Sequence, residues 1–180
     1  MNNASISTRT RQNPENSNRA ISRLTLITLC KLTAIIIVIG LLTSCGKKNV
    51  KPQPTIIAAQ VIVSPGVNPD ASNRPSPIVL RIYELKALGK FKAADFFGLM
   101  SDDAAMLGKD LLHREELHLA PGVKQPYHRK VPPETEHIGI IAAYRNINEA
   151  VWKVMAPVPA NKTSVFTISV NDLALSIQSQ

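Results

Sequence analysis

Cys45 is the residue of this chain whose type and setting predict a chemical modification. It directly follows the stretch LLTS of residues 41–44, in which two leucines are followed by two small residues, and Gly46 comes next. This order is typical of a bacterial lipoprotein signal, in which the cysteine thiol is acylated and a peptidase cuts before that cysteine. The apolar run enters the bilayer, and small residues before the cut fit a narrow active site. We therefore expect Cys45 to be the lipid-bearing first residue of the mature protein.

The alternative for this segment is an uncleaved transmembrane helix that happens to contain a cysteine. The uncharged run from Leu32 to Leu42 has 11 residues, whereas a membrane-spanning helix needs about 20. Extending the run back to Leu24 would place Lys31 inside the hydrocarbon, which is energetically costly. The run therefore fits the core of a signal peptide better than a membrane anchor.

The expected leader, residues 1–44, begins with a long basic segment. Residues 1–31 contain the single acid Glu15 and five basic residues, which are Arg9, Arg11, Arg19, Arg23 and Lys31. Such a charge balance holds the segment on the cytoplasmic side of the membrane. Because the segment is long for a signal peptide, two interpretations stay open. Translation starts downstream of Met1, or the first residues form a disordered cytoplasmic stub.

Most of the remaining charge in the chain is mixed in sign. The formal net charge of the whole chain is +8, but the leader holds 5 Lys/Arg and 1 acid, which leaves 16 basic and 12 acidic residues in positions 45–180, a net charge of +4. A nucleic-acid-binding protein would show a basic stripe with interleaved aromatic residues. Only Lys47, Lys48 and Lys51 are densely clustered, directly after the expected lipid, where they can touch anionic head groups. We expect no nucleic acid among the partners.

The mature chain lacks the residue patterns of catalysis or metal binding. Cys30 leaves with the leader and Cys45 carries the lipid, so no thiol remains for a disulfide or a nucleophile. The histidines are scattered over three expected strands and suggest no third convergent metal ligand; they are His113, His118, His128 and His137. Glu115 and Glu116 are adjacent in a strand and face opposite ways. We expect no enzymatic activity, no metal, and no cofactor other than the covalent lipid on Cys45.

After the cut, a short tether leads to one domain. Residues 45–54 are polar and contain two prolines, which favours a flexible, lipidated tether. Gly46 stands where an aspartate would favour retention in the inner membrane of a Gram-negative bacterium, so its presence points to the outer membrane. Residues 55–180 are expected to form a single domain, long enough to be stabilised by its own core.

The pattern of residues 55–180 predicts a mainly β domain. Eight segments show alternation or β-branched composition, namely 55–63, 78–85, 112–119, 124–131, 136–144, 151–155, 163–170 and 173–177. Residues 90–111 change to helical spacing and predict two short helices, the second one capped by Ser101, Asp102 and Asp103. We interpret these two aspartates as cap residues rather than catalytic acids. The expected fold is an antiparallel β-sandwich with a two-helix insertion.

The segment VNPDASNRPSP, residues 67–77, is the strongest candidate for a binding surface. A plain hairpin connection is the alternative, but such connections usually take 2–5 residues. A longer loop stiffened by three prolines has little entropy left to lose on binding. We predict Arg74 as the interface anchor, within a set of partner-binding residues that comprises Asn68, Pro69, Asp70, Asn73, Arg74, Pro75 and Ser76.

Several stretches of the mature chain strongly resemble the TssJ family (also called VasD or SciN), the outer-membrane lipoproteins of the type VI secretion system. They are VNPDASNRPSPIVLRIYELK (67–86), FKAADFF (91–97), DDAAMLGKDLLHREEL (102–117) and GIIAAYRNINEAVWK (139–153). The similarity covers nearly all of residues 60–170, and the proline-rich loop followed by the R-x-Y-x-L strand is specific. The long leader departs from the family pattern, as does Asn73, where a glycine would be expected before the arginine.

The resemblance implies a transthyretin-like β-sandwich of about eight strands with a short two-helix insertion. It also implies that acyl chains hold the domain on the outer membrane, facing the periplasm. The implied partner is the periplasmic C-terminal domain of TssM, bound through the loop between the first two strands, about residues 66–77. With TssL these proteins form the envelope-spanning complex that docks the injection machine. A different function would be that of a carrier lipoprotein with a small ligand inside the sandwich, which requires a cavity.

Overall fold

The computed structural model of the protein describes residues 28, 31 and 53–180. The chain divides after Val50 into two units, and the account below concerns the second one. Cys45, the predicted cleavage site and the predicted tether up to residue 52 lie outside the described residues. Thr28 and Lys31 have helical backbone. In the part of the chain that the structure describes, no helix is long and apolar enough to span a membrane.

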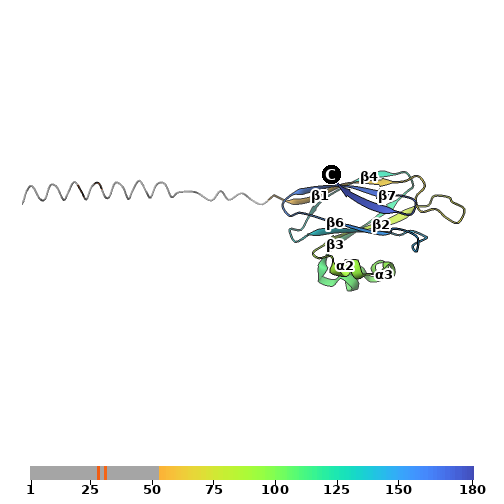
Figure 1. Ribbon diagram of the computed structural model, residues 1–180, viewed down its shortest axis with the longest axis horizontal. Coiled ribbons are helices and arrows are strands. Elements are labelled where there is room, and N and C mark those ends of the chain that lie inside the picture. Colours follow the sequence, from red (N-terminus) through yellow and green to blue (C-terminus); the bar gives the residue numbers. More distant parts are fainter. Residues whose placement is uncertain (1–27, 29–30, 32–52) are drawn as a thin grey trace, which may run out of the picture. The chain divides into compact units, whose positions relative to one another are not determined.

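The described domain consists of eight strands with a helical segment between the second and the third (Figure 1). Its elements in chain order are β1 (Thr55–Val63), β2 (Ile78–Leu85), α2 (Gly89–Ala93), α3 (Phe96–Leu107), the 3-10 turn η1 (Gly108–Asp110), β3 (Leu111–Leu119), β4 (Lys124–Val131), β5 (His137–Ala142), β6 (Lys153–Pro157), β7 (Thr163–Val170) and β8 (Leu175–Ser179). The eight predicted strands are confirmed, each within two residues at either end.

The strands form two sheets that pack face to face as a sandwich (Figure 1). One sheet has the order β4-β1-β7-β8 and the other the order β3-β2-β5-β6. Neighbouring strands are antiparallel in five of the six pairs, and β1 runs parallel to β7 with Ile56 opposite Thr163. The predicted antiparallel sandwich is therefore confirmed, with one parallel pair in its centre.

The core between the sheets follows from the alternation of apolar residues along the strands. In β1 every second side chain is buried. Ile57 and Val61 of this strand meet Leu80 and Ile82 of β2 and Phe166 of β7 in one apolar cluster, and all five are 2% exposed or less. Burying such a side chain contributes about 1.5–3 kcal/mol. The sandwich thus has a continuous core that needs no disulfide.

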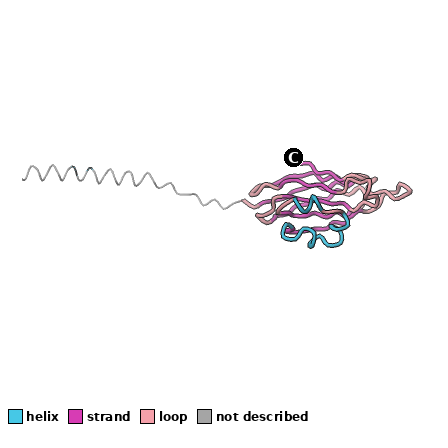
Figure 2. The backbone as a smooth tube through the Cα atoms, turned by 60° about the horizontal axis from the view of Figure 1, so that its bottom comes forward, coloured by secondary structure: helices cyan, strands magenta, loops and turns pink. Residues whose placement is uncertain are grey.

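A second apolar core lies on the outer face of the β3-β2-β5-β6 sheet, where the helices cover it (Figure 2). Tyr83 and Leu85 of β2 are buried there against Phe91 of α2 and Leu99 of α3. The sequence predicted one apolar face for β2, and the end of this strand is buried on both faces. At Gly139 of β5 a Cβ atom would lie 2.7 Å from the Phe91 ring, so only a glycine lets this ring rest on the sheet.

Helix α3 begins and bends at two aspartates. Asp95 caps α3 by accepting a hydrogen bond from the Gly98 N–H at 2.9 Å. The backbone leaves helical geometry at Asp102, whose carboxylate accepts from the Ala105 N–H at 3.0 Å. The predicted cap at Asp102 is therefore confirmed, and α3 is two short helices joined at this kink.

The predicted role of Asp103 as a cap residue is wrong. Its carboxylate is buried and accepts a hydrogen bond from the guanidinium of Arg114 at 2.9 Å, with the guanidinium of Arg81 at 3.7 Å. Arg81 also donates to the carbonyl oxygens of Leu99 and Met100. Because an unpaired buried charge costs several kcal/mol, these arginines fix α3 to the sheet, and Asp103 has a packing role.

Candidate partner-binding loop

The loop between β1 and β2 extends from one end of the sandwich (Figure 1). Strand β1 enters the domain at Thr55 and reaches this end at Val63, after nine residues. At about 3.3 Å per residue the strand spans about 30 Å. The loop of residues 64–77 therefore projects from the end of the domain opposite to the one at which the chain enters.

Asn68 fastens the base of this loop to the sandwich. It is 3% exposed, and its backbone N–H donates to the Asp172 carbonyl at 3.0 Å. Its side-chain amide donates to the Pro77 carbonyl at 2.9 Å and accepts from the Arg145 N–H at 2.8 Å. The backbone φ of Asn68 is +52°, a left-handed conformation that asparagine tolerates better than most residues. One buried residue thus ties together three loops at this end of the domain.

A network around Asp70 closes the tip of the loop. The Asp70 carboxylate accepts from the backbone N–H groups of Ser72 and Arg74 at 2.8 and 3.0 Å. The backbone also closes on itself, because the Asp70 N–H donates to the Arg74 carbonyl at 2.9 Å. The guanidinium of Arg74 donates to the same carboxylate from Nε at 2.9 Å. Residues 70–74 therefore form a compact, hydrogen-bonded ring rather than an extended loop segment.

The charge of Arg74 is held in place and is still open to a partner. Its side chain is 78% exposed, and its second contact with the Asp70 carboxylate, from Nη2, measures 2.8 Å. Exposed ion pairs contribute little to folding stability. The pair nevertheless orders the guanidinium before any partner arrives, which lowers the entropy lost on binding.

The hydrogen bonds of the ring act on the pKa of Asp70. The backbone N–H of Arg74, followed by its guanidinium, lowers the pKa of this carboxyl below its usual value of 3.8. A carboxyl whose pKa is depressed by folding stabilises the folded form above its ordinary pKa, and this stabilisation is lost as pH falls through the lowered pKa. The ring should therefore stay intact at any pH above about 5.

We predict that the loop tip loses order only in acid. The protection of the Ser72 and Arg74 amides against hydrogen exchange should be constant between about pH 5 and 8, and should fall as the pH drops below the lowered pKa of Asp70. Amide exchange measured by NMR checks this, with the Asn68 amide, which bonds to the backbone carbonyl of Asp172, as internal control. Equal loss at both places would show general acid unfolding instead.

The backbone conformation of Asn73 explains why an asparagine can stand where the family pattern predicts a glycine. Its φ is +59°, in the region where glycine is favoured and asparagine is the commonest substitute. Its N–H donates to the Asp70 carbonyl at 2.9 Å, so the residue closes the turn. A glycine and an asparagine therefore support the same turn at this position.

The residues predicted to bind a partner fall into two groups. Asn73, Arg74 and Pro75 are exposed, and Pro69 and Asp70 are half-buried. Asn68 and Ser76 are buried. The exposed group forms the surface that a partner can reach, together with the adjacent Ala71 and Ser72. The buried pair supports the loop from inside.

Residues far away in the sequence also support the loop and were not predicted. The Ser64 hydroxyl donates to the Asp172 carboxylate at 2.8 Å and accepts from the Gly66 N–H at 3.1 Å. The Tyr144 hydroxyl donates to the Asn171 carbonyl at 3.0 Å, and burial raises the pKa of this tyrosine. The loop is thus braced by the β5–β6 and β7–β8 connections, whose sequences show no pattern that signals this role.

The described residues show no arrangement that would hold a metal ion. Within positions 28, 31 and 53–180, no three His, Cys, Asp or Glu side chains lie together at a suitable distance. Glu115 contacts Arg129, whereas Glu116 contacts Arg81 and His118. These two glutamates therefore point to opposite faces, as predicted. The exposed loop is the surface that offers a candidate function.

Comparisons with known proteins agree with the resemblance found in the sequence. The model of the family described as type VI secretion lipoprotein, VasD, EvfM, TssJ matches residues 55–173. A search of curated proteins finds no significant match. Among solved structures, the lipoprotein TssJ1 of the type VI secretion system of Pseudomonas aeruginosa is 33% identical, with a TM-score of 0.69 over 71% of this chain and 97% of that chain.

Two further solved structures share the fold at lower identity. Serratia marcescens Lip, described as a membrane-bound component of the type VI secretion system, is 24% identical with a TM-score of 0.65, over 69% of this chain and 98% of that chain. A chain of the structure described as the TssM C-terminal domain from EAEC is 21% identical with a TM-score of 0.57, over 68% and 99% of the two chains. The length of the family match and the identity to TssJ1 show that this chain belongs to the type VI secretion lipoprotein family of VasD, EvfM and TssJ.

Proposed function

We propose that this lipoprotein is a structural, non-catalytic component of the type VI secretion membrane complex. In this role, acyl chains on Cys45 anchor the domain to the outer membrane on its periplasmic side. The loop between β1 and β2 binds the periplasmic C-terminal domain of TssM, and TssL belongs to the same complex. Arg74, Asn73 and Pro75 touch the partner, with Pro69 and Asp70 at the margin of the contact. Asn68 and Ser76 hold the loop in shape.

The observation that carries this proposal is the ordered loop at the end of the domain opposite to the entry of the chain. The ring of residues 70–74 and the buried Asn68 fix the loop in one conformation, as expected for a preformed binding surface. The sandwich between the two ends is rigid because its core is closely packed. Force applied to the loop would thus be transmitted to the tether. The description of one solved structure that contains a chain of this fold names the TssM C-terminal domain, which supports the choice of TssM as partner.

Anchoring rests on the sequence, since Cys45 lies outside the described residues. The apolar run before Cys45 is too short to span a membrane, and the lysines after it suit a head-group surface. Lip of Serratia marcescens, which shares the fold, is described as membrane bound. These observations together support lipidation of Cys45 as the means of anchoring.

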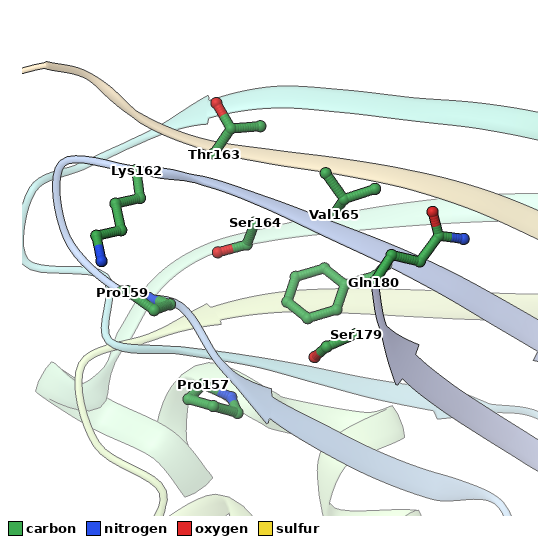
Figure 3. A pocket seen from close by; sticks show the side chains of 9 residues that line it. Pro157, Pro159, Lys162, Thr163, Ser164, Val165, Ser179 and Gln180 are labelled. Carbon is green, nitrogen blue, oxygen red and sulfur yellow. The ribbon is translucent and has the colours of Figure 1, made fainter.

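The carrier function would require a cavity inside the sandwich, and the inter-sheet space is filled by apolar side chains instead. Hollows of about 230, 240 and 280 Å³ lie on the outside of the described domain, where they are open to solvent. One of them is formed by Pro157, Pro159 and the ends of β7 and β8 (Figure 3). Ligand pockets usually measure about 300–1,000 Å³ and enclose the ligand. We therefore favour the assembly role.

Replacement of the loop tests the proposal. Tagged full-length protein is purified from detergent-solubilised envelope, with either the native loop or residues 67–77 replaced by a Gly/Ser linker, and captured TssM is measured by immunoblotting. We expect capture by the native form and loss of at least about 90% of it with the linker, because the preformed contact surface is removed. A matched control replaces the exposed Pro133 and Glu134 in the β4–β5 turn by Gly-Ser and should capture TssM normally.

Each other outcome contradicts a defined part of the proposal. Equal capture by the native and linker forms would move the interface to another part of the sandwich. If none of the forms captures TssM, the assembly role itself fails and the carrier role becomes the better explanation. Thermal unfolding of the linker form shows whether the sandwich has remained folded.

A further inference from the structure

The β4-β1-β7-β8 sheet differs in charge from the rest of the domain. Positions 45–180 contain 12 acidic residues, and none of them lies in the four strands of this sheet. In the other sheet the strands contain the acids Glu84, Glu115 and Glu116. The basic residues of the acid-free sheet all lie in β4 and are Lys124, Arg129 and Lys130. Arg129 pairs with the buried Glu84, so the two lysines set the charge of the outward side.

The outward side of this sheet is one continuous surface. Burial alternates along its strands, so every second side chain points away from the core. We call these outward side chains, at alternate positions of 56–62, 124–130 and 163–169, the outer sheet face. The strand register sets them side by side in rows across β4, β1 and β7, of which two are Lys130, Ile56 and Thr163, and His128, Ala58 and Val165. Figure 3 shows Thr163 and Val165 on the side of β7 that is turned away from the helices.

The composition of the outer sheet face favours a layer of phosphate groups over a protein partner. Lys124 and Lys130 are exposed at its two ends, and uncharged side chains such as Ala58 and Val165 lie between them. The outward positions include no Phe, Trp, Tyr, Met or Arg, the types that are enriched in protein interfaces. They do include Lys, Ala and Ser, which are depleted there. A lysine binds a phosphate group as a point charge, which suits the head groups of anionic lipids.

The acids that come next along the chain lie beyond the ends of these strands. Asp172 follows β7, and its carboxylate accepts a hydrogen bond from the Ser64 hydroxyl at 2.8 Å. Glu134 and Glu136 follow β4, in the connection that leads to the other sheet, where the Glu136 N–H donates to the Leu85 carbonyl at 3.0 Å. These carboxylates keep their charge, but they border the outer sheet face and do not lie on it. The charge of the face itself is therefore positive.

The membrane lies within reach of this face when Cys45 carries the lipid. Strand β1 begins ten residues after Cys45, and ten residues reach at most about 35 Å. Lys130 is close to the start of the described domain, because it lines an open hollow together with Gln53 and Pro54. Four to eight basic residues near a membrane anchor are typical of binding to anionic lipid. Here they are Lys47, Lys48 and Lys51 of the predicted tether, with Lys124 and Lys130 of the face.

We propose that the outer sheet face lies against the anionic phospholipid head groups of the membrane that holds the lipid anchor, with Lys124 and Lys130 on lipid phosphates. This inference rests on the proposed function, because the acyl chains on Cys45 must hold the domain at the membrane. The contact gives the tethered domain a defined orientation. The helices, which cover the other sheet (Figure 1), then face away from the membrane. The β1–β2 loop, at the end of β1, then projects along the membrane surface.

The test measures how well the membrane shields this face. The lipidated protein is purified in detergent with Val165→Cys, which is 41% exposed in the native protein, carries a fluorophore there, and is reconstituted into vesicles. We expect quenching by acrylamide to be at least about threefold weaker in vesicles that contain phosphatidylglycerol than in vesicles of phosphatidylcholine alone. This difference should disappear at high salt. The same label on the exposed Ala104→Cys of α3 should be quenched equally in both kinds of vesicle.

Charge reversal shows whether the lysines cause the shielding. Lys124→Glu combined with Lys130→Glu should remove the difference between the two kinds of vesicle, because both contacts with lipid phosphate become repulsive. The matched control is Lys86→Glu combined with Lys109→Glu, which makes the same change of charge at exposed lysines outside the sheet and should retain the difference. Unchanged thermal unfolding of each variant shows that the sandwich is intact.

The outcomes separate this inference from the proposed function. Equal quenching at Val165→Cys in both kinds of vesicle, with the protein firmly inserted, overturns the lipid contact and leaves the anchoring role intact. Shielding that persists after the reversal of Lys124 and Lys130 also overturns it, because the contact then does not depend on this face. If that variant instead loses capture of TssM, the face binds protein and not lipid. If the protein does not insert into either kind of vesicle, the anchor itself is absent and both proposals fail.

Discussion

Replacing Cys45 by serine is expected to abolish secretion while the domain itself stays folded. The serine hydroxyl does not replace the thiol in lipidation, so the acyl chains are lost. Each buried methylene contributes about 0.8 kcal/mol to membrane binding, and stable anchoring takes more than one chain. The variant should therefore lose palmitate labelling and leave the outer-membrane fraction. The thermal midpoint of the sandwich should stay constant, since its core begins at β1, ten residues beyond Cys45.

A matched control is Ser44→Ala, which keeps a small residue before the cut and should retain labelling, location and secretion. Normal secretion by Cys45→Ser would rule out an anchoring role for the lipid. Loss of palmitate with an unchanged membrane location would instead support the uncleaved helix, which is the alternative for residues 32–42. The experiment thus also decides whether residues 32–42 are the core of a cleaved signal peptide or an uncleaved transmembrane helix.

The strands could be predicted from the sequence because their pattern is local. In β7 the alternation of the sequence matches the burial of Phe166, Ile168 and Val170 on one face, whereas β1 is predicted from its β-rich composition. Strand pairing is a long-range property, and the parallel contact of β1 with β7 joins residues more than 100 positions apart. No feature within either strand distinguishes a parallel from an antiparallel neighbour. The sequence therefore predicted the correct class of fold and not the one parallel pair.

The roles of the charged residues in the helical insertion also depend on long-range contacts that the local sequence does not reveal. Asp102 and Asp103 are adjacent, and local rules for helix starts apply equally to both. Only Asp102 has the extended backbone that a cap requires, and the side chain of Asp103 points inward to Arg114 of β3. This partner lies in another element, so its position depends on how the sheet and the helices pack. Spacing along the chain carries no information on that packing.

For the proposed binding loop, the sequence indicated a segment that the structure describes as an ordered, projecting loop, but it did not indicate which residues of the segment are buried. Proline content and length singled out residues 67–77, since both act locally. Asn68 was predicted as a contact residue, but its amide is buried and used within the protein. Its partners Arg145 and Asp172 come from connections that are remote in sequence. In the proposed interface Asn68 is therefore a positioning residue, which leads to a specific expectation.

Replacing Asn68 by alanine should destabilise the domain and weaken partner binding together. The substitution leaves the Arg145 N–H and the Pro77 carbonyl without their partners, and alanine is strained at a φ of +52°. We expect the free energy of unfolding to fall by about 2–4 kcal/mol. A domain of ordinary stability survives such a loss at 25 °C. Urea denaturation measures the stability, and titration with the TssM periplasmic domain measures the affinity.

Asn73→Gly is the matched control, because Asn73 has nearly the same left-handed backbone but is exposed and glycine adopts this conformation without strain. It is the control for the stability measurement, and it should change the free energy of unfolding by less than about 1 kcal/mol. Any loss of affinity in this variant reports the contact that the exposed Asn73 side chain makes with the partner. If Asn68→Ala is destabilised as expected but binds with native affinity, then loop order does not contribute to recognition. Binding would in that case depend on the exposed side chains alone, with Arg74 as the first to replace.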